Sequence, residues 1–163
     1  MYSDDFRENY VITPKKGTTG NERFYIMALD DIDNSEHYWY KSAYNKMTID
    51  TSEDFEKGKE NTQTMISQWN SNKYPPQDDN DMWGLIQTQV NNGWFVPSRA
   101  EWSAFAEELG ITEDNYVNYN LSDSYWSSSQ HNPGGAWLAD FIDGCMLSGT
   151  VIGDFYVRLA ATF

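Results

Sequence analysis

The last third of the chain places aromatic residues on either side of a run with an unusual composition. Residues 126–130 read Trp-Ser-Ser-Ser-Gln, and the chain closes on Tyr-Val-Arg-Leu-Ala-Ala-Thr-Phe at 156–163. The run between them, residues 131–155, contains no Lys, Glu or Gln. Surface loops usually carry such long polar side chains because these stay solvated at little cost. The run is therefore either a buried β segment or a surface selected for something other than solubility.

Alternation within this run favours a strand over residues 136–142, since the side chains of a strand point to opposite faces with a period of two. One face would carry Trp137, Ala139 and Phe141, which read as core. The other would carry Ala136, Leu138, Asp140 and Ile142, a mixture that is typical of a binding surface. We expect Trp126, Trp137 and Phe141 to be buried, and Leu138, Ile142 and Leu147 to face outward.

Length and composition indicate one domain, residues 1–163, with enough chain for a real core. Aromatic residues make up 16% of the chain, and long aliphatic runs are few. This composition favours a compact α+β fold over a helical bundle. No segment approaches the roughly 20 apolar residues that cross a bilayer, so direct membrane insertion is not expected. The N-terminus shows neither the basic nor the apolar region of a signal peptide.

The formal net charge of −14 bears on the partners that the protein can have. Nucleic-acid binding relies on Lys and Arg to neutralise phosphates, so a duplex would be repelled. Anionic membrane surfaces are disfavoured for the same reason. Solubility alone also accounts for much of this charge.

Local signals predict three helices and a strand over residues 23–29. Thr51 or Ser52 would cap the first helix, which ends before the two prolines at 75–76. A second would run from Asp81 to Val90 and bury Met82, Leu85 and Ile86. The third opens with the capping box of Ser98 and Glu101 and ends at Gly110.

Cofactors and catalytic groups find little support in the sequence. Cys145 is the only cysteine, so no internal disulfide can form, and no His lies near it in sequence to activate it as a nucleophile. The acidic clusters at 30–36 and 78–81 lack the glycine and distal Glu of an EF-hand, and solvated loop acids are the simpler interpretation. The two histidines lie too far apart in sequence to suggest a zinc pair. We therefore expect no metal, no cofactor and no enzymatic activity.

Residues 93–102 read Gly-Trp-Phe-Val-Pro-Ser-Arg-Ala-Glu-Trp, which resembles the Gly-Trp-x-x-Pro-[Ser/Thr]-x-x-Glu-[Trp/Leu] signature of C-type-lectin-fold domains. Those domains include the formylglycine-generating-enzyme-like group. Tyr-Trp-Ser-Ser-Ser-Gln at 125–130, Ala-Trp at 136–137 and Val-Arg-Leu at 157–159 match that group in order and spacing. The chain resembles in particular the variable proteins of diversity-generating retroelements. The match is specific from about Asp54 to Phe163 and vaguer over residues 1–50.

This resemblance implies a C-type-lectin-like fold, with two to three helices around small antiparallel sheets and the N- and C-terminal strands close together. In that family adenine-directed mutation turns Asn codons into codons that cannot specify Lys, Glu, Gln, Met or Trp. Residues 131–155 fit this rule except at Trp137 and Met146, which would be invariant. Residues 126–163 would then form the variable ligand-binding region. The expected ligand-binding residues are His131, Asn132, Pro133, Gly134, Gly135, Leu138, Asp140, Ile142, Asp143, Cys145, Leu147, Ser148, Gly149, Thr150, Ile152, Gly153, Asp154 and Phe155.

Three functions remain open from the sequence. The one we expect is a receptor-recognition protein with a hypervariable surface, carried on a virion tail tip or a microbial cell surface, that binds a protein or surface ligand on a host or neighbouring cell. A calcium-independent carbohydrate-binding domain is the alternative, since the calcium and sugar motif of lectins is absent. A formylglycine-generating oxidase is the weakest, because such enzymes use a cysteine pair that this chain lacks.

Overall fold

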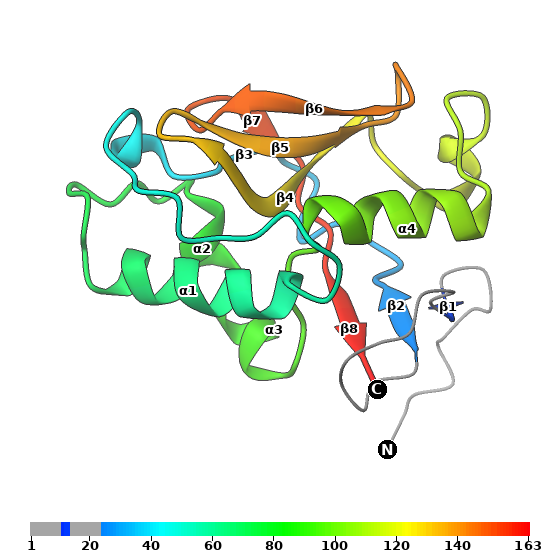
Figure 1. Cartoon of the computed structure of the whole chain (residues 1–163), viewed down its shortest axis with the longest axis horizontal. Coiled ribbons are helices and arrows are strands. Elements are labelled where there is room, and N and C mark those ends of the chain that lie inside the picture. Colours follow the sequence, from blue (N-terminus) through cyan, green and yellow to red (C-terminus); the bar gives the residue numbers. More distant parts are fainter. Residues whose placement is uncertain (1–10, 14–23) are drawn as a thin grey trace.

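The computed structural model describes residues 11–13 and 24–163 and has an α+β architecture of short strands and helices (Figure 1). The described elements are, in order, β1 (Val11–Ile12), β2 (Tyr25–Met27), β3 (His37–Tyr38), η2 (Lys41–Ala43), α1 (Gly58–Asn70), α2 (Met82–Leu85), α3 (Gln87–Asn91), α4 (Arg99–Leu109), η3 (Tyr116–Tyr119), β4 (Ser124–Asn132), β5 (Gly135–Asp140), β6 (Cys145–Thr150), β7 (Asp154–Phe155) and β8 (Ala160–Thr162). The strand expected over 23–29 is therefore shorter, and Arg23 lies outside the described residues.

The described strands form small antiparallel sheets, as expected. One has the order β1-β2-β8, a second pairs β3 with β7, and a third has the order β4-β5-β6. The first sheet joins the two ends of the chain, because Ile26 of β2 lies opposite Ala161 of β8. This pairing confirms that the N- and C-terminal strands lie close together.

The predicted third helix is confirmed as α4. The Ser98 side chain accepts a hydrogen bond from the Glu101 backbone N–H, and the Glu101 carboxylate accepts one from the Ser98 N–H at 2.7 Å. Both donors would otherwise be unsatisfied at the helix start. Gly110 ends the helix with φ of 68°, a left-handed conformation that glycine adopts without the steric penalty of a Cβ.

The first helix starts later than predicted. Neither Thr51 nor Ser52 caps it, because α1 begins at Gly58. The residues that look like a cap make tertiary contacts instead: the Ser52 N–H donates to Asn61 Oδ1, and the Asp54 carbonyl accepts a hydrogen bond from Ser98 Oγ. Gly58 is needed at the start, since a Cβ there would lie 2.1 Å from Glu101 Oε2.

The second predicted helix is two short helices, so the described chain has four α-helices rather than two or three. The break falls at Ile86, whose φ and ψ of −95° and 0° leave the helical region. Met82 and Ile86 are buried as predicted, whereas Leu85 is exposed and Trp83 takes the buried position. Trp83 lies in the core, where its ring and that of Trp39 pack in a T-shaped arrangement.

In the β4-β5-β6 sheet, β4 and β5 are covered on both faces, whereas β6 lies at the open outer edge (Figure 1). Along β4, Tyr125 stacks on Trp102 of α4, while its neighbour Trp126 packs edge-on against Phe155 of β7. Successive residues of a strand point to opposite faces, so α4 and β7 lie on opposite sides of the sheet. The core is thus divided into two aromatic-rich clusters, one on each side.

Candidate functional site

The residues predicted to bind ligand fall on two hairpin turns, the edge strand β6 and the turn that follows it. Those that are exposed are His131, Asn132, Pro133, Ile142, Asp143, Cys145, Leu147, Ser148, Thr150, Ile152 and Asp154. Those that are partly exposed are Asp140, Gly149, Gly153 and Phe155. Gly134, Gly135 and Leu138 are buried. Because the sheet is antiparallel, the two turns lie at its opposite ends, with β6 running between them.

Leu138 was expected to face outward, and this expectation is wrong. Its side chain is 3% exposed and belongs to the same cluster as Trp126. A Cβ added to Gly149 would lie 2.7 Å from Leu138 Cδ2, so the leucine also fills the space beside β6. The alternation of apolar and polar residues predicts which side chains are buried only where one face of the strand is exposed to solvent. Both faces of β5 are covered.

The two glycines of the first turn are buried because the turn packs against its surroundings. A Cβ on Gly134 would lie 2.5 Å from Asn45 Oδ1, and a Cβ on Gly135 would lie 3.1 Å from the Gly149 carbonyl. The Val151 N–H donates to the Gly134 carbonyl and ties the turn to the end of β6. Gly134 and Gly135 therefore hold the turn in place and do not form part of the surface that a ligand would contact.

Ile142 and Leu147 are exposed as predicted, and Ile152 is a third apolar side chain that is exposed to solvent. Their exposed fractions are 58%, 38% and 44%. Phe155, by contrast, is only partly exposed, since its ring packs against Trp126 with centroids 4.8 Å apart. Three apolar side chains at or near β6 are therefore available to a ligand, and Phe155 mainly supports the core.

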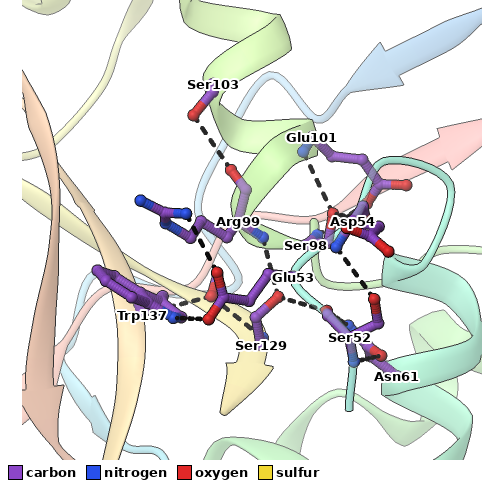
Figure 2. A network of polar contacts seen from close by, with 11 residues as sticks. Ser52, Glu53, Asp54, Asn61, Ser98, Arg99, Glu101, Ser103, Ser129 and Trp137 are labelled. Atoms are coloured by element: carbon purple, nitrogen blue, oxygen red, sulfur yellow. Dashed lines mark hydrogen bonds and ion pairs between the residues drawn. The ribbon is translucent and has the colours of Figure 1, made fainter. Parts of the chain in front are cut away.

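Trp137 was predicted to be core but is only partly buried, in a cluster with charged residues (Figure 2). Its indole N–H donates to Glu53 Oε1 at 2.6 Å, and Glu53 Oε2 accepts a hydrogen bond from Arg99 at 3.1 Å. The Arg99 guanidinium lies 4.1 Å from the indole centroid, and the His131 ring packs edge-on at 4.5 Å. The Trp137 ring is therefore contacted on its face and its edge.

Sequence reasoning missed the roles of Glu53 and Arg99 in this cluster. One signal was available, because Arg99 is the only Lys or Arg between Lys73 and Arg158. A single cationic residue in an acidic stretch of sequence indicates a specific ion-pair partner. Glu53 carried no comparable signal, since its sequence context resembles the first turn of a helix.

Serines of β4 anchor the cluster to the rest of the fold (Figure 2). Ser129 Oγ donates to the Ser52 carbonyl at 2.8 Å and accepts a hydrogen bond from the Arg99 N–H at 2.9 Å. Ser127 Oγ donates to the Trp137 carbonyl at 2.7 Å. Small hydroxyl side chains satisfy buried backbone groups here without occupying core volume. The Trp-Ser-Ser-Ser motif thus positions the loop that carries Glu53.

The acidic clusters have protein partners that account for several of their carboxylates. Asp31 pairs with the buried Arg158 at 2.8 Å, and Asp33 accepts a hydrogen bond from His37 at 2.7 Å. Asp78 pairs with Lys41 at 3.3 Å. Burial raises the pKa of Asp81, although hydrogen bonds such as that from the Lys41 N–H oppose the rise. Within the described ranges, no three His, Cys, Asp or Glu side chains gather as metal ligands would.

A cavity of about 200 Å³ lies between α4 and the β5–β6 hairpin. Its lining residues are Trp102, Ser103, Ala106, Ile111, Thr112, Ala139, Asp140, Phe141, Gly144, Cys145 and Met146. Two of these, Asp140 and Cys145, belong to the predicted ligand-binding set, and Asp143 of that set lies between them in the chain. The cavity therefore opens next to the exposed hairpin and is the hollow part of the candidate site.

No model of a known protein family matches the chain, and no curated protein does. The fold is similar to part of a solved structure, a fimbrial protein from Bacteroides ovatus, with a TM-score of 0.54 and 14% sequence identity. The similar region covers 86% of this chain and 36% of the fimbrial protein, so the chain spans about a third of that protein's length. At this identity the likeness concerns the fold alone. None of the helices in the described part of the chain is long and apolar enough to cross a membrane.

Proposed function

We propose that the protein is a non-enzymatic ligand-binding module with a C-type-lectin-like fold, and that residues 126–163 form its variable ligand-binding region. The observation that carries the proposal is the contrast within this region. The positions that the resemblance marks as variable are mostly exposed on β6 and the adjoining turns, whereas Trp126, Phe141 and Val157 are buried. A surface of this kind can change its side chains without changing the packing beneath it.

The chemistry of the exposed residues fits recognition of a protein or cell-surface ligand. Ile142, Leu147 and Ile152 supply apolar contact area. Small exposed residues such as Ser148 and Thr150 do not protrude far and leave these apolar side chains accessible. Protein interfaces draw most of their energy from a few such anchors. The shared fold with part of a fimbrial protein fits a location on a microbial cell surface, and a virion tail tip stays the other location in the proposal.

Carbohydrate binding by aromatic stacking fits the site less well. Stacking needs an open aromatic face, and the ring of Trp137 is already covered by Arg99 at 4.1 Å and by His131 at 4.5 Å. Oxidase chemistry of the formylglycine-generating kind needs a cysteine pair, and Cys145 is the only cysteine. We therefore retain the protein-binding function.

Diversification of the region can be tested in the genome that encodes the protein. A near-identical copy of the DNA for residues 126–163 should lie nearby, with adenines at the codons of the exposed positions and not at those of Trp126 or Trp137. Absence of any such copy would remove the retroelement from the proposal and leave the binding surface to be tested separately.

The binding surface itself can be tested with a matched pair of variants. Labelled protein would be scored for binding to a panel of intact bacterial cells by flow cytometry. Replacing Ile142, Leu147 and Ile152 with Ser should abolish binding. The control replaces Ile49, Leu85 and Val117, whose exposed fractions are 57%, 38% and 63%, and should leave binding unchanged. Binding lost in the control and kept in the first variant would place the site elsewhere.

A further inference from the structure

The cavity between α4 and the β5–β6 hairpin has an apolar floor. Trp102 and Ala106 of α4 line one side, and Ala139 and Met146 line the other. Trp102 is 1% exposed and its indole N–H donates to the Trp126 carbonyl, so the deepest wall is fixed by the core. The cavity is therefore a preformed hollow rather than a gap that the side chains would close.

Its volume limits what can enter. About 200 Å³ falls below the roughly 300–1,000 Å³ that is usual for pockets holding drug-sized ligands or cofactors. A space of this size suits one long side chain. Since the floor of the cavity is apolar, the side chain that enters it must have an apolar stem.

Carboxylates stand around the mouth of the cavity. Asp140 is part of its lining, and Asp143 follows in the same turn, where its N–H donates to Asp140 Oδ1 at 2.9 Å. Glu113 reaches the lining at Gly144, where an added Cβ would lie 2.7 Å from its Oε2. Asp123 lies nearby and accepts a hydrogen bond from Tyr116 at 2.8 Å. Asp123 and, more weakly, Asp140 help to raise the pKa of that tyrosine.

The stretch of sequence that contains these carboxylates has no Lys or Arg to balance them. Residues 100–157 contain nine Asp and Glu and no Lys or Arg. The cations that flank this stretch are engaged, Arg99 with Glu53 at 3.1 Å and Arg158 with Asp31 at 2.8 Å in the core. Among the described residues, Asp140, Asp143, Glu113 and Asp123 have no ion-pair partner. An apolar hollow with an uncompensated acidic mouth is complementary to an aliphatic stem that ends in a positive charge.

We propose that this cavity is a docking site for an Arg or Lys side chain on a basic segment of the protein that the module binds. The inference rests on the proposed function and adds the chemistry of the partner to it. The aliphatic stem lies between Trp102 and Met146, and the charged head meets Asp140 and Glu113 at the mouth. The strand β6 borders the cavity and has β5 as its only strand partner in the described part of the chain, so its outer edge is open to an extended segment.

The probe is a fluorescein-labelled peptide in which Arg alternates with Gly, compared with the same peptide carrying Gln in place of Arg. Fluorescence polarisation at low ionic strength measures the dissociation constants, with a reducing agent present to keep Cys145 as the thiol. We expect the Arg peptide to bind at least about tenfold more tightly than the Gln peptide, because only the Arg head can pair with the carboxylates.

Two double variants of equal net charge separate the cavity from the overall negative field. D140N with E113Q neutralises the mouth and should weaken Arg-peptide binding by about tenfold. D79N with E36Q neutralises two exposed acids in the loops before β3 and α2, neither of which lines the cavity, and should change binding less than about twofold, as expected for long-range charge. Equal weakening by the two variants, or no binding of the Arg peptide at all, overturns the inference.

Cys145 reports on occupancy of the cavity because it is exposed and forms part of the lining. Alkylation by iodoacetamide, a neutral reagent, should slow when the Arg peptide is bound and stay unchanged with the Gln peptide. An unchanged alkylation rate at saturating Arg peptide would mean that the peptide binds elsewhere and would contradict the inference. The proposed function is tested apart from this, by the serine variant of Ile142, Leu147 and Ile152.

Discussion

The neighbouring strands β5 and β6 belong to one sheet and are paired residue by residue, yet they meet opposite environments. In β5, Ala136, Leu138 and Ala139 are buried, because α4 covers one face and the β3–β7 pair covers the other. In β6, Cys145, Leu147, Ser148 and Thr150 are exposed. The comparison shows that one sheet separates buried residues from exposed residues across the width of a single strand.

The sharpest form of this comparison uses the register partners Leu138 and Leu147. Leu138→Ala should lower the free energy of unfolding by about 2–5 kcal/mol, because it leaves a cavity among Trp126, Phe155 and β6. Leu147→Ala removes the same atoms from a side chain that is 38% exposed and should cost less than about 1 kcal/mol. Urea denaturation of the two variants measures both values. Equal costs would break the distinction between the strands.

The helix that covers β5 contains a buried carboxylate whose ionisation should affect stability. Burial raises the pKa of Glu101 to about 7, although hydrogen bonds donated by Ser98 and Gly58 oppose the rise. The folded protein therefore holds a proton that the unfolded chain, with its usual value of 4.5, has lost. The stability that Glu101 contributes is present below the unfolded pKa and is lost as the pH rises through about 7.

Glu101→Gln should remove this dependence. Between pH 5 and pH 8 the native protein should lose roughly 2–3 kcal/mol of unfolding free energy relative to this variant. Glu107→Gln, on the exposed face of the same helix, is the control and should give no such trend. Urea midpoints at several pH values provide the measurement, and a constant difference for Glu101→Gln would show that Glu101 does not titrate in this range.

A smaller effect is expected at Trp137, whose side chain is the only partly buried one between Ala136 and Ala139. Trp137→Phe keeps an aromatic ring but removes the indole N–H that donates to Glu53, and should cost about 1 kcal/mol. A double-mutant cycle with Glu53→Ala should return a coupling of similar size, because each change removes one partner of the same hydrogen bond. Additive costs would mean that the contact in Figure 2 contributes nothing measurable.

The sequence predicted the parts of the fold that depend on local chemistry. The capping box at Ser98 and the glycine at 110 determine α4 by hydrogen bonds and conformational preference within a few residues. The start of α1 depends instead on which partners Ser52 and Asp54 find far along the chain, and local reasoning placed it wrongly. The exposed positions of β6 and the turns were expected from composition together with the family resemblance. The burial of Leu138 was not, because nothing in its neighbourhood indicates that β7 covers that face.

The central claim is that the exposed positions can vary without a change of fold, and one comparison tests it directly. A variant that replaces Ile142, Leu147, Ser148, Thr150 and Ile152 together with Asn, Ser or Ala should keep its melting temperature within a few degrees of the native protein, since each exposed change costs within about 0.5 kcal/mol. A variant that replaces Leu138 alone with Ser should melt far lower, because a hydroxyl enters the core as the leucine is lost. A large loss of stability in the five-residue variant, or none in the Leu138 variant, would contradict the account.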